Sequence, residues 1–193
     1  QRKANTRFSR KARSDLVRGL EEQGIIGNTL LEVGCGPGDL TRQMVKAGAS
    51  RAVGIDLTSD TLDEARKRTD EEGLSDKIEF TTGNGAIDHL PASDMVVLDK
   101  VICCYPGWRQ LIDNTSAAAG KTYGFVIPRS DGWHGAVTRV FIATGTFFLK
   151  FKKCGFKPFV HDYLRIHEHL TSKGFERTYI RRGPIWMAAV YAR

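Results

Sequence analysis

The sequence has few cysteines and no long apolar run. Its four cysteines in 193 residues lack the C-x-x-C spacing of a zinc site and the density of a disulfide scaffold. No stretch of about 18 apolar residues occurs, and no secretory signal pattern opens the chain. We therefore expect a cytoplasmic protein without a membrane span. The sequence starts at Gln1 and leaves open whether residues precede it.

Acidic residues are scarce near the N-terminus, so the net charge of +7 is spread unevenly along the chain. There Asp15 faces a run of basic residues: Arg2, Lys3, Arg7, Arg10, Lys11, Arg13 and Arg18. Such a run is either the solvated face of a helix or a patch for an anionic partner. We favour the solvated face, and a nucleic-acid partner stays open but is not favoured.

Apolar spacing predicts an alternation of helices and strands. A basic amphipathic helix is expected over 6–23, so that 1–24 precedes a folded domain over 25–193. Strands are predicted at 29–33, 51–55, 77–81, 94–98 and 122–127, with helices at 39–47, 59–72 and 108–119, the last stopped by Gly120. This order indicates a single α/β domain with a doubly wound, mostly parallel sheet.

The last third of the chain has a different pattern. Residues 135–151 are apolar and long enough for a helix. Two final strands are predicted at 175–182 and 185–191, separated by Gly183-Pro184, and they favour a terminal antiparallel hairpin.

A glycine-rich turn, Gly34–Gly38, follows the first predicted strand. In an open parallel sheet, ligands bind beyond the carboxyl ends of the strands at the point where the strand order reverses. The glycines allow positive φ angles and a close approach to bare backbone, and Pro37 suits the first turn of the next helix. The turn is therefore the expected binding site.

The residues around this turn favour one class of ligand. A dinucleotide-binding G-x-G-x-x-G motif starting at Gly34 would need glycine where Asp39 stands. Glu32 suits the cationic amino-acid end of a sulfonium ligand, and Asp56, after the second strand, is placed to accept ribose hydroxyls. Together they indicate an adenosyl group that carries a cation.

The segment Glu32-Val33-Gly34-Cys35-Gly36-Pro37-Gly38, with Asp56 one strand later, resembles the first two motifs of class I S-adenosylmethionine-dependent methyltransferases. The resemblance implies S-adenosylmethionine as cofactor and a Rossmann-like, seven-stranded sheet that ends in a reversed hairpin. The implied cofactor-binding residues are Glu32, Gly34, Cys35, Gly36, Gly38, Asp56 and Leu57.

The later motifs of the family match less closely. Gly83-Asn84-Gly85 stands where the family often has Gly-Asp, so Asn84 and Gly85 are expected at the adenine, with the Asn84 carbonyl oxygen accepting from its amino group. Asp99 and Lys100 are expected to face the methionine moiety. The segment 98–106 also resembles, more weakly, small methyltransferases similar to magnesium-protoporphyrin O-methyltransferases.

Methyl transfer from a sulfonium is a direct displacement, for which a general base is optional. Tyr105, after the fourth strand, is the first catalytic candidate and His134 the second, although Tyr105 could simply pack on the next helix and His134 lie in a surface loop. No metal is expected, because His161, His167 and His169 have no partner spacing that completes a site.

We therefore expect a methyltransferase for a small-molecule acceptor, with O-methylation favoured and residues 130–172 as a substrate-covering insertion. An RNA or protein methyltransferase is an alternative, weakened because no Asn-Pro-Pro-Tyr-type tetrapeptide follows the fourth strand. A non-catalytic binding module is another alternative. The sequence does not define the acceptor or the oligomeric state.

Overall fold

The computed structural model of the chain describes residues 7–133, 135–136 and 159–193. His134 and most of the predicted apolar segment 135–151 lie outside the described residues. No helix in the described ranges is long and apolar enough to cross a membrane. In chain order the elements are α1 (Arg7–Glu21), β1 (Thr29–Val33), α2 (Asp39–Lys46), β2 (Arg51–Asp56), α3 (Ser59–Glu71), β3 (Ile78–Thr82), β4 (Ser93–Asp99), η2 (Ile102–Cys104), α4 (Trp108–Ala117), β5 (Ala119–Pro128), α6 (Tyr163–Thr171), β6 (Glu176–Arg182) and β7 (Trp186–Ala192).

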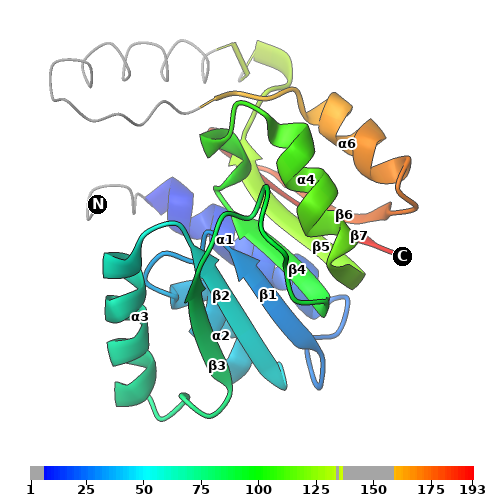
Figure 1. Cartoon of the computed structure of the whole chain (residues 1–193). Coiled ribbons are helices and arrows are strands. Elements are labelled where there is room, and N and C mark those ends of the chain that lie inside the picture. Colours follow the sequence, from blue (N-terminus) through cyan, green and yellow to red (C-terminus); the bar gives the residue numbers. More distant parts are fainter. Residues whose placement is uncertain (1–6, 134, 137–158) are drawn as a thin grey trace, which may run out of the picture.

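The strands form one seven-stranded sheet in the order β3-β2-β1-β4-β5-β7-β6 (Figure 1). Strands β1 to β5 pair in parallel, whereas β7 runs antiparallel to both β5 and β6. The predicted doubly wound sheet with its terminal hairpin is confirmed. Because β1 lies between β2 and β4, the strand order reverses at its carboxyl end, directly before the glycine turn.

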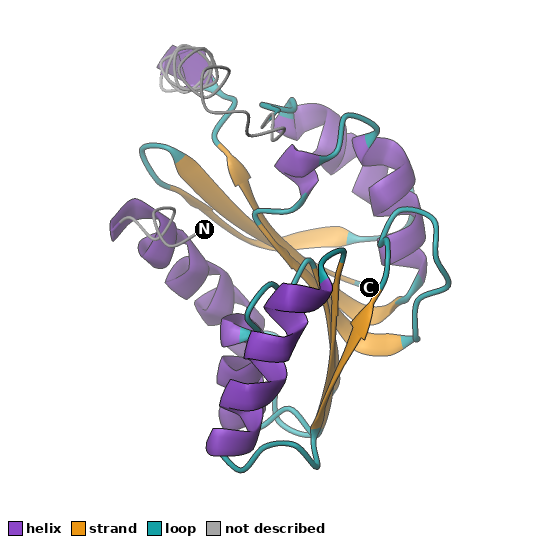
Figure 2. Ribbon diagram, turned by 60° about the vertical axis from the view of Figure 1, so that its left-hand side comes forward, coloured by secondary structure: helices purple, strands orange, loops and turns teal. Residues whose placement is uncertain are grey.

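Helices cover both faces of the sheet (Figure 2). One core cluster joins α1, α2 and α3 to the sheet through Leu16, Leu40 and Leu62. The other joins α4 and α6 through residues such as Leu111 and Ile166. Side chains alternate along β1, since Leu30 belongs to the first cluster and Leu31 to the second. Glu32 therefore shares a face with Leu30, toward α1 and α2.

The first helix packs closely on the sheet. Leu16 and Leu20 are fully buried. A Cβ atom on Gly19 would lie 2.6 Å from the Tyr179 ring, and one on Gly124 would lie 3.0 Å from Leu16. Helix α1 thus rests on β5, β6 and β7 through a contact that needs glycine on both sides.

Two local predictions need correction. The helix predicted over 108–119 ends at Ala117, and Gly120 lies within β5. The cause is tertiary: the Ser93 backbone N–H donates to the Ala118 carbonyl at 2.9 Å, which draws this stretch into the sheet. Helix α6 was not predicted, although Asp162 caps it by accepting from the Leu164 N–H at 2.9 Å.

Candidate functional site

The glycine turn has the backbone conformation that the sequence predicts. Gly34, Gly36 and Gly38 have φ angles of 72°, 52° and 69°. The N–H groups of Gly34 and Cys35 both donate to the Ile55 carbonyl, at 2.6 and 3.0 Å. The turn is thereby held against the end of β2.

Space around the turn differs from glycine to glycine. A Cβ atom on Gly34 would lie 2.4 Å from Val101 and one on Gly38 would lie 2.6 Å from Phe80, whereas one on Gly36 would meet nothing within 4 Å. Gly36 therefore presents bare backbone to open space, as a ligand-binding turn requires. Cys35 is buried, and burial raises the pKa of its thiol above the ordinary value.

Pro37 does not lie in the first turn of the following helix. Helix α2 begins at Asp39 after the left-handed N-cap Gly38, so Pro37 precedes the cap. Its carbonyl accepts a hydrogen bond from Arg42 Nη1 at 2.7 Å. That contact closes the turn on the side of α2.

Asp56, at the end of β2, supports the turn directly. One carboxylate oxygen accepts from the Gly36 N–H at 2.8 Å. The other accepts from the Thr58 N–H at 3.1 Å and the Thr58 hydroxyl at 2.9 Å. Beside it, the Leu57 side chain is exposed. A carboxylate, an apolar side chain and open backbone thus meet at one edge of the sheet.

The loop after β3 is linked to the loop after β4. Asn84 Oδ1 accepts from the Ala86 N–H at 3.0 Å and from the Tyr105 hydroxyl at 3.1 Å. This is the oxygen that the sequence assigns to adenine, and here it has two protein donors. Gly85 packs tightly, since a Cβ there would lie 2.3 Å from Val33. The structure therefore brings Tyr105 and Asn84 together beside the end of β1.

Glu32 is a buried carboxyl group with one hydroxyl partner. Its residue is 2% exposed, and the Thr41 hydroxyl donates to it. Burial raises the pKa of Glu32 from 4.5 to about 8. Near neutral pH the folded protein therefore holds a proton here that the unfolded chain does not.

This buried proton makes stability depend on pH. Because the folded pKa lies above the unfolded value, the free energy of unfolding should fall as pH rises from about 4.5 to about 8. Glu32→Gln keeps an acceptor for Thr41 but does not titrate, so its urea midpoint should change less across this range. Glu64→Gln, at an exposed position on α3, should keep the parent's slope. Equal slopes for parent and Glu32→Gln would contradict the assignment.

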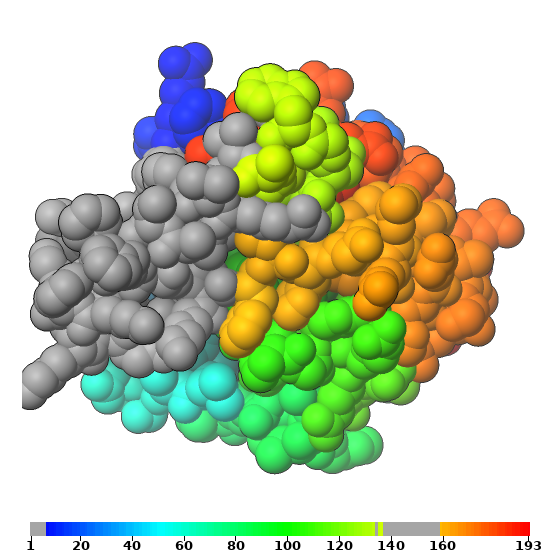
Figure 3. All heavy atoms as spheres, turned by 90° about the horizontal axis from the view of Figure 1, so that it is seen from above, coloured from blue at the N-terminus to red at the C-terminus, as the bar shows by residue number. Residues whose placement is uncertain are grey.

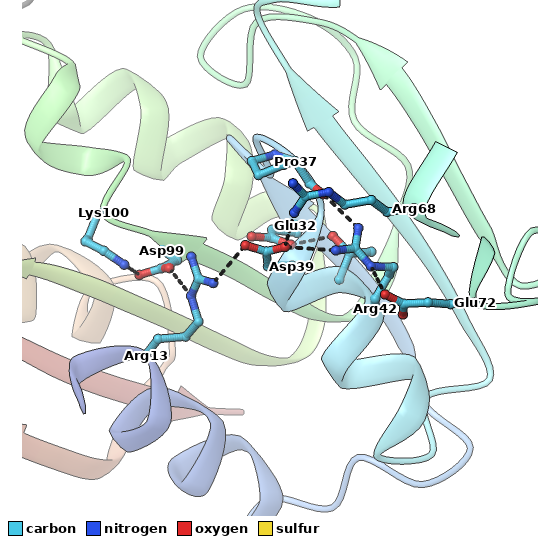
Figure 4. A network of polar contacts seen from close by, with 10 residues as sticks. Arg13, Glu32, Pro37, Asp39, Arg42, Arg68, Glu72, Asp99 and Lys100 are labelled. Carbon is cyan, nitrogen blue, oxygen red and sulfur yellow. Dashed lines mark hydrogen bonds and ion pairs between the residues drawn. The ribbon is translucent and has the colours of Figure 1, made fainter. Parts of the chain in front are cut away.

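Asp99, at the end of β4, anchors two cations (Figure 4). Its side chain is 2% exposed, with Arg13 Nε 2.7 Å from one oxygen and Lys100 Nζ 2.5 Å from the other. Arg13 Nη1 also lies 3.7 Å from Asp39. Helix α1 therefore places a guanidinium group beside the carboxylates of Asp39 and Asp99. We call this the acidic side of the glycine turn.

Arg13 is a site residue that the sequence did not predict. It belongs to the basic run of the N-terminal segment, but its spacing from Leu16 and Leu20 matches the buried face of the helix. That spacing is the signal that separates Arg13 from exposed neighbours such as Arg10.

Loss of this guanidinium should weaken the fold. Arg13→Met leaves the buried Asp99 carboxylate with Lys100 as its remaining cation, and we expect the free energy of unfolding to fall by about 2 kcal/mol. Urea denaturation measures the change. Arg10→Met, on the exposed side of the same helix, should leave the midpoint unchanged. If the two variants unfold alike, the Arg13–Asp99 pair contributes no stability.

The segment that begins at Phe159 lies against the loop that follows β4. The Phe159 N–H donates to the Cys103 carbonyl at 2.7 Å, and His161 Nε2 lies 2.9 Å from the Tyr105 carbonyl oxygen. The Phe159 and His161 rings stack at 5.7 Å. In Figure 3 the orange stretch that begins at residue 159 lies beside the green residues after β4. His161 thus touches the loop of the first catalytic candidate.

The other two histidines of this region lie on α6. His167 Nδ1 is 3.2 Å from the Tyr191 hydroxyl, and His169 Nε2 is 2.8 Å from Asp113. Both contacts hold α6 against neighbouring elements. Burial lowers the pKa of His161 and of His167.

Comparison with known proteins now identifies this arrangement. Residues 30–120 match the family model described as "Methyltransferase domain". The matched stretch contains the glycine turn, Asp56, Asn84 and Tyr105. Residues 30–120 form a class I methyltransferase domain. The resemblance inferred from the glycine turn is confirmed, and S-adenosylmethionine is the cofactor of this class.

Curated relatives of the methyltransferase domain share part of its length. A ubiquinone biosynthesis O-methyltransferase from Actinobacillus pleuropneumoniae is 39% identical over 80 residues, which are 42% of this chain and 34% of that protein. A ribosomal protein L11 methyltransferase from Photobacterium profundum is 34% identical over 59 residues, 31% of this chain and 20% of that protein. The matched region therefore spans 34% of one relative and 20% of the other.

Solved structures match the methyltransferase domain and its flanking elements over nearly the whole chain. Magnesium protoporphyrin IX methyltransferase from Synechocystis PCC 6803, with bound SAH, has a TM-score of 0.74 at 16% identity and covers 96% of this chain and 83% of that one. A putative sarcosine dimethylglycine methyltransferase from Galdieria sulphuraria has a TM-score of 0.73 at 9% identity, with 94% and 85% covered. These likenesses show the fold.

Proposed function

We propose that this protein transfers a methyl group from S-adenosylmethionine to an oxygen atom of a small-molecule acceptor. The observation that carries the proposal is the open backbone at Gly36, whose N–H is fixed by the Asp56 carboxylate. A turn with free space on one side and a carboxylate behind it suits an adenosyl ligand at the carboxyl end of β1.

The surrounding residues suit the parts of this cofactor. Asp56 is proposed to accept the ribose hydroxyls, with Leu57 against the adenine. Asn84 and Gly85 are proposed to lie at the adenine end of the cofactor. The cationic methionine end of the cofactor is proposed to face the Asp99 carboxylate, with the buried Glu32 carboxyl group beside it.

Arg13 supplies the opposite charge on the acidic side of the glycine turn. Its guanidinium group, 2.7 Å from Asp99, is proposed to bind the carboxylate at the methionine end of the cofactor. Lys100 Nζ is the second cation there, 2.5 Å from the same residue. Acidic and basic groups thus stand side by side, as a zwitterionic amino-acid end requires.

When bound, the cofactor would supply an activated methyl group for the acceptor oxygen. The protein then has to align the two partners and exclude water. Burial raises the pKa of Tyr105, so its hydroxyl keeps the proton that it donates to Asn84, and its oxygen can accept a further hydrogen bond. Tyr105 is therefore proposed to orient groups beside the methyl. His134 stays the second candidate.

The region 130–172 is proposed to cover the acceptor. Its described part supports this role, because Phe159 and His161 contact the loop that carries Tyr105. The names of two matched proteins, a ubiquinone biosynthesis O-methyltransferase and a magnesium protoporphyrin IX methyltransferase, support a small-molecule acceptor.

Two measurements test the proposal in sequence. Calorimetry with S-adenosylhomocysteine tests the cofactor site, and absence of binding would contradict it. Incubation with methyl-labelled S-adenosylmethionine and a panel of phenols, catechols and carboxylic acids, including magnesium protoporphyrin IX, tests the acceptor. Label on an acceptor oxygen supports the proposal. Binding without transfer to any acceptor would instead favour a binding module.

Protein methylation is a second candidate. It is favoured by several relatives named ribosomal protein L11 methyltransferase, which match 31–40% of this chain. Purified L11 protein added to the same labelled reaction separates the two candidates. Label in the protein band, with none in the small molecules, would replace the first proposal by this one.

A further inference from the structure

Two adjacent cysteines lie beside the proposed methyl-transfer site. Cys103 and Cys104 belong to η2, between β4 and Tyr105. Both thiols donate to the Lys100 carbonyl oxygen, with sulfur-to-oxygen distances of 3.3 and 3.4 Å. Lys100 has a left-handed φ of 66°. Because both thiols share one acceptor, their sulfur atoms are gathered on one side of the loop.

One member of the pair is accessible to solvent. Cys103 is buried, whereas Cys104 is partly exposed. The neighbouring Cys103 thiol lowers the pKa of the Cys104 thiol, and the Asp56 carboxylate acts on the same thiol in the opposite direction. Cys104 is thus the more readily ionised thiol, and it lies within electrostatic reach of the proposed ribose-binding carboxylate.

Chemistry limits what two adjacent thiols bind well. A disulfide between neighbouring residues closes a strained ring, which a bridging atom between the sulfurs would enlarge and relax. Thiolates select soft, thiophilic centres. Among the described residues, no group of three or more His, Cys, Asp or Glu side chains could hold a metal ion, so the four-ligand shell of zinc is not offered. A centre that needs two thiols fits best.

We propose that Cys103 and Cys104 form a dithiol binding site for trivalent, singly substituted arsenicals. Two sulfur–arsenic bonds form and the arsenic–oxygen bond of the arsenical oxide breaks. Both thiol protons leave with that oxygen as water, and no atom changes oxidation state. The third bond of arsenic is to its own carbon substituent, so no further protein ligand is needed.

Occupation of this site should oppose cofactor binding. This consequence rests on the proposed function, because it requires the cofactor to lie between Asp56 and the loop after β4. An arsenic atom with its organic group on Cys104 then competes for the same space.

Phenylarsine oxide is the probe that tests the dithiol site. The double variant Cys35→Ala/Cys154→Ser keeps the adjacent pair and should gain one phenylarsenic group per chain in intact mass spectra. The adduct should survive excess glutathione, a monothiol, and be released by dithiothreitol, a dithiol. Cys103→Ser and Cys104→Ser, each added to that background, should lose the stable adduct. Retention of the adduct in either variant, or its removal by glutathione, would overturn the proposal.

Controls separate this site from the cofactor proposal and from misfolding. Thermal melting of each variant tests its fold, and Cys104→Ser, at the partly exposed position, provides the test if Cys103→Ser unfolds. Calorimetry on the protein without substitutions should show its S-adenosylhomocysteine affinity falling at least tenfold after treatment with phenylarsine oxide. If the untreated protein does not bind this ligand, the proposed function fails while the mass result still decides the dithiol site. Unchanged affinity after treatment would refute the location beside the cofactor.

Discussion

Asp56→Ala should weaken S-adenosylhomocysteine binding by about 100-fold. The Asp56 carboxylate fixes the Gly36 N–H at 2.8 Å and is proposed to accept the ribose hydroxyls. Hydrogen bonds to charged groups contribute about 1.5–3 kcal/mol each. Loss of about 3 kcal/mol corresponds to roughly 100-fold in the dissociation constant. Titration calorimetry on the two proteins measures this difference directly.

Asp63→Ala is the matched control for this prediction. Asp63 lies on α3, its side chain is 75% exposed, and it pairs with Arg66 at 2.9 Å. Its loss removes the same charge from the same region without touching the glycine turn, so affinity should stay within about twofold. An Asp56→Ala protein that binds as tightly as this control would remove Asp56 from the site.

Gly34→Ala should lower the free energy of unfolding by about 2–5 kcal/mol. A left-handed backbone costs a residue with a Cβ about 1–2 kcal/mol, and Gly34 has a φ of 72°. The new methyl group would also lie 2.4 Å from Val101 Cγ2, and overpacking of this kind costs about 1–3 kcal/mol. Urea denaturation followed by circular dichroism measures the sum.

Gly36→Ala separates strain from ligand binding. Its φ of 52° has a comparable backbone cost, but its Cβ meets nothing within 4 Å, so the expected loss is only about 1–2 kcal/mol. The same methyl group occupies space proposed for the cofactor, so affinity for S-adenosylhomocysteine should fall more than tenfold. A Gly36→Ala protein with normal affinity would place the cofactor elsewhere.

Local sequence signals predict the central strands well. Thr29–Val33 is a short apolar run between Asn28 and Gly34, and the strand has these bounds. Arg51–Asp56 was predicted to within one residue for the same reason. In a parallel sheet that is buried on both faces, each strand is a continuous apolar stretch, so the boundary residues are easily recognised.

Contacts between distant segments were not predictable from local patterns. Arg13 meets Asp99 across 86 positions, and His161 meets Tyr105 across 56. Charge and spacing identify Arg13 as a helix residue, but its partner depends on how α1 docks on the sheet. The predicted end of α4 was wrong for the same reason, because pairing of Ser93 with Ala119 in the sheet outweighs local helix preference.

The docking of α1 on the sheet and the binding of the cofactor are coupled under the proposed function. Arg13 joins this helix to Asp99, so under the proposed function the cofactor and the helix stabilise one another through shared charges. Linkage is reciprocal: whatever factor the docked helix adds to cofactor affinity, the cofactor adds to helix docking. Amide protons of α1 should therefore exchange more slowly with solvent when the cofactor is bound. A macromolecule that bound the basic side of this helix and weakened its docking would therefore lower the affinity for the cofactor without contacting it.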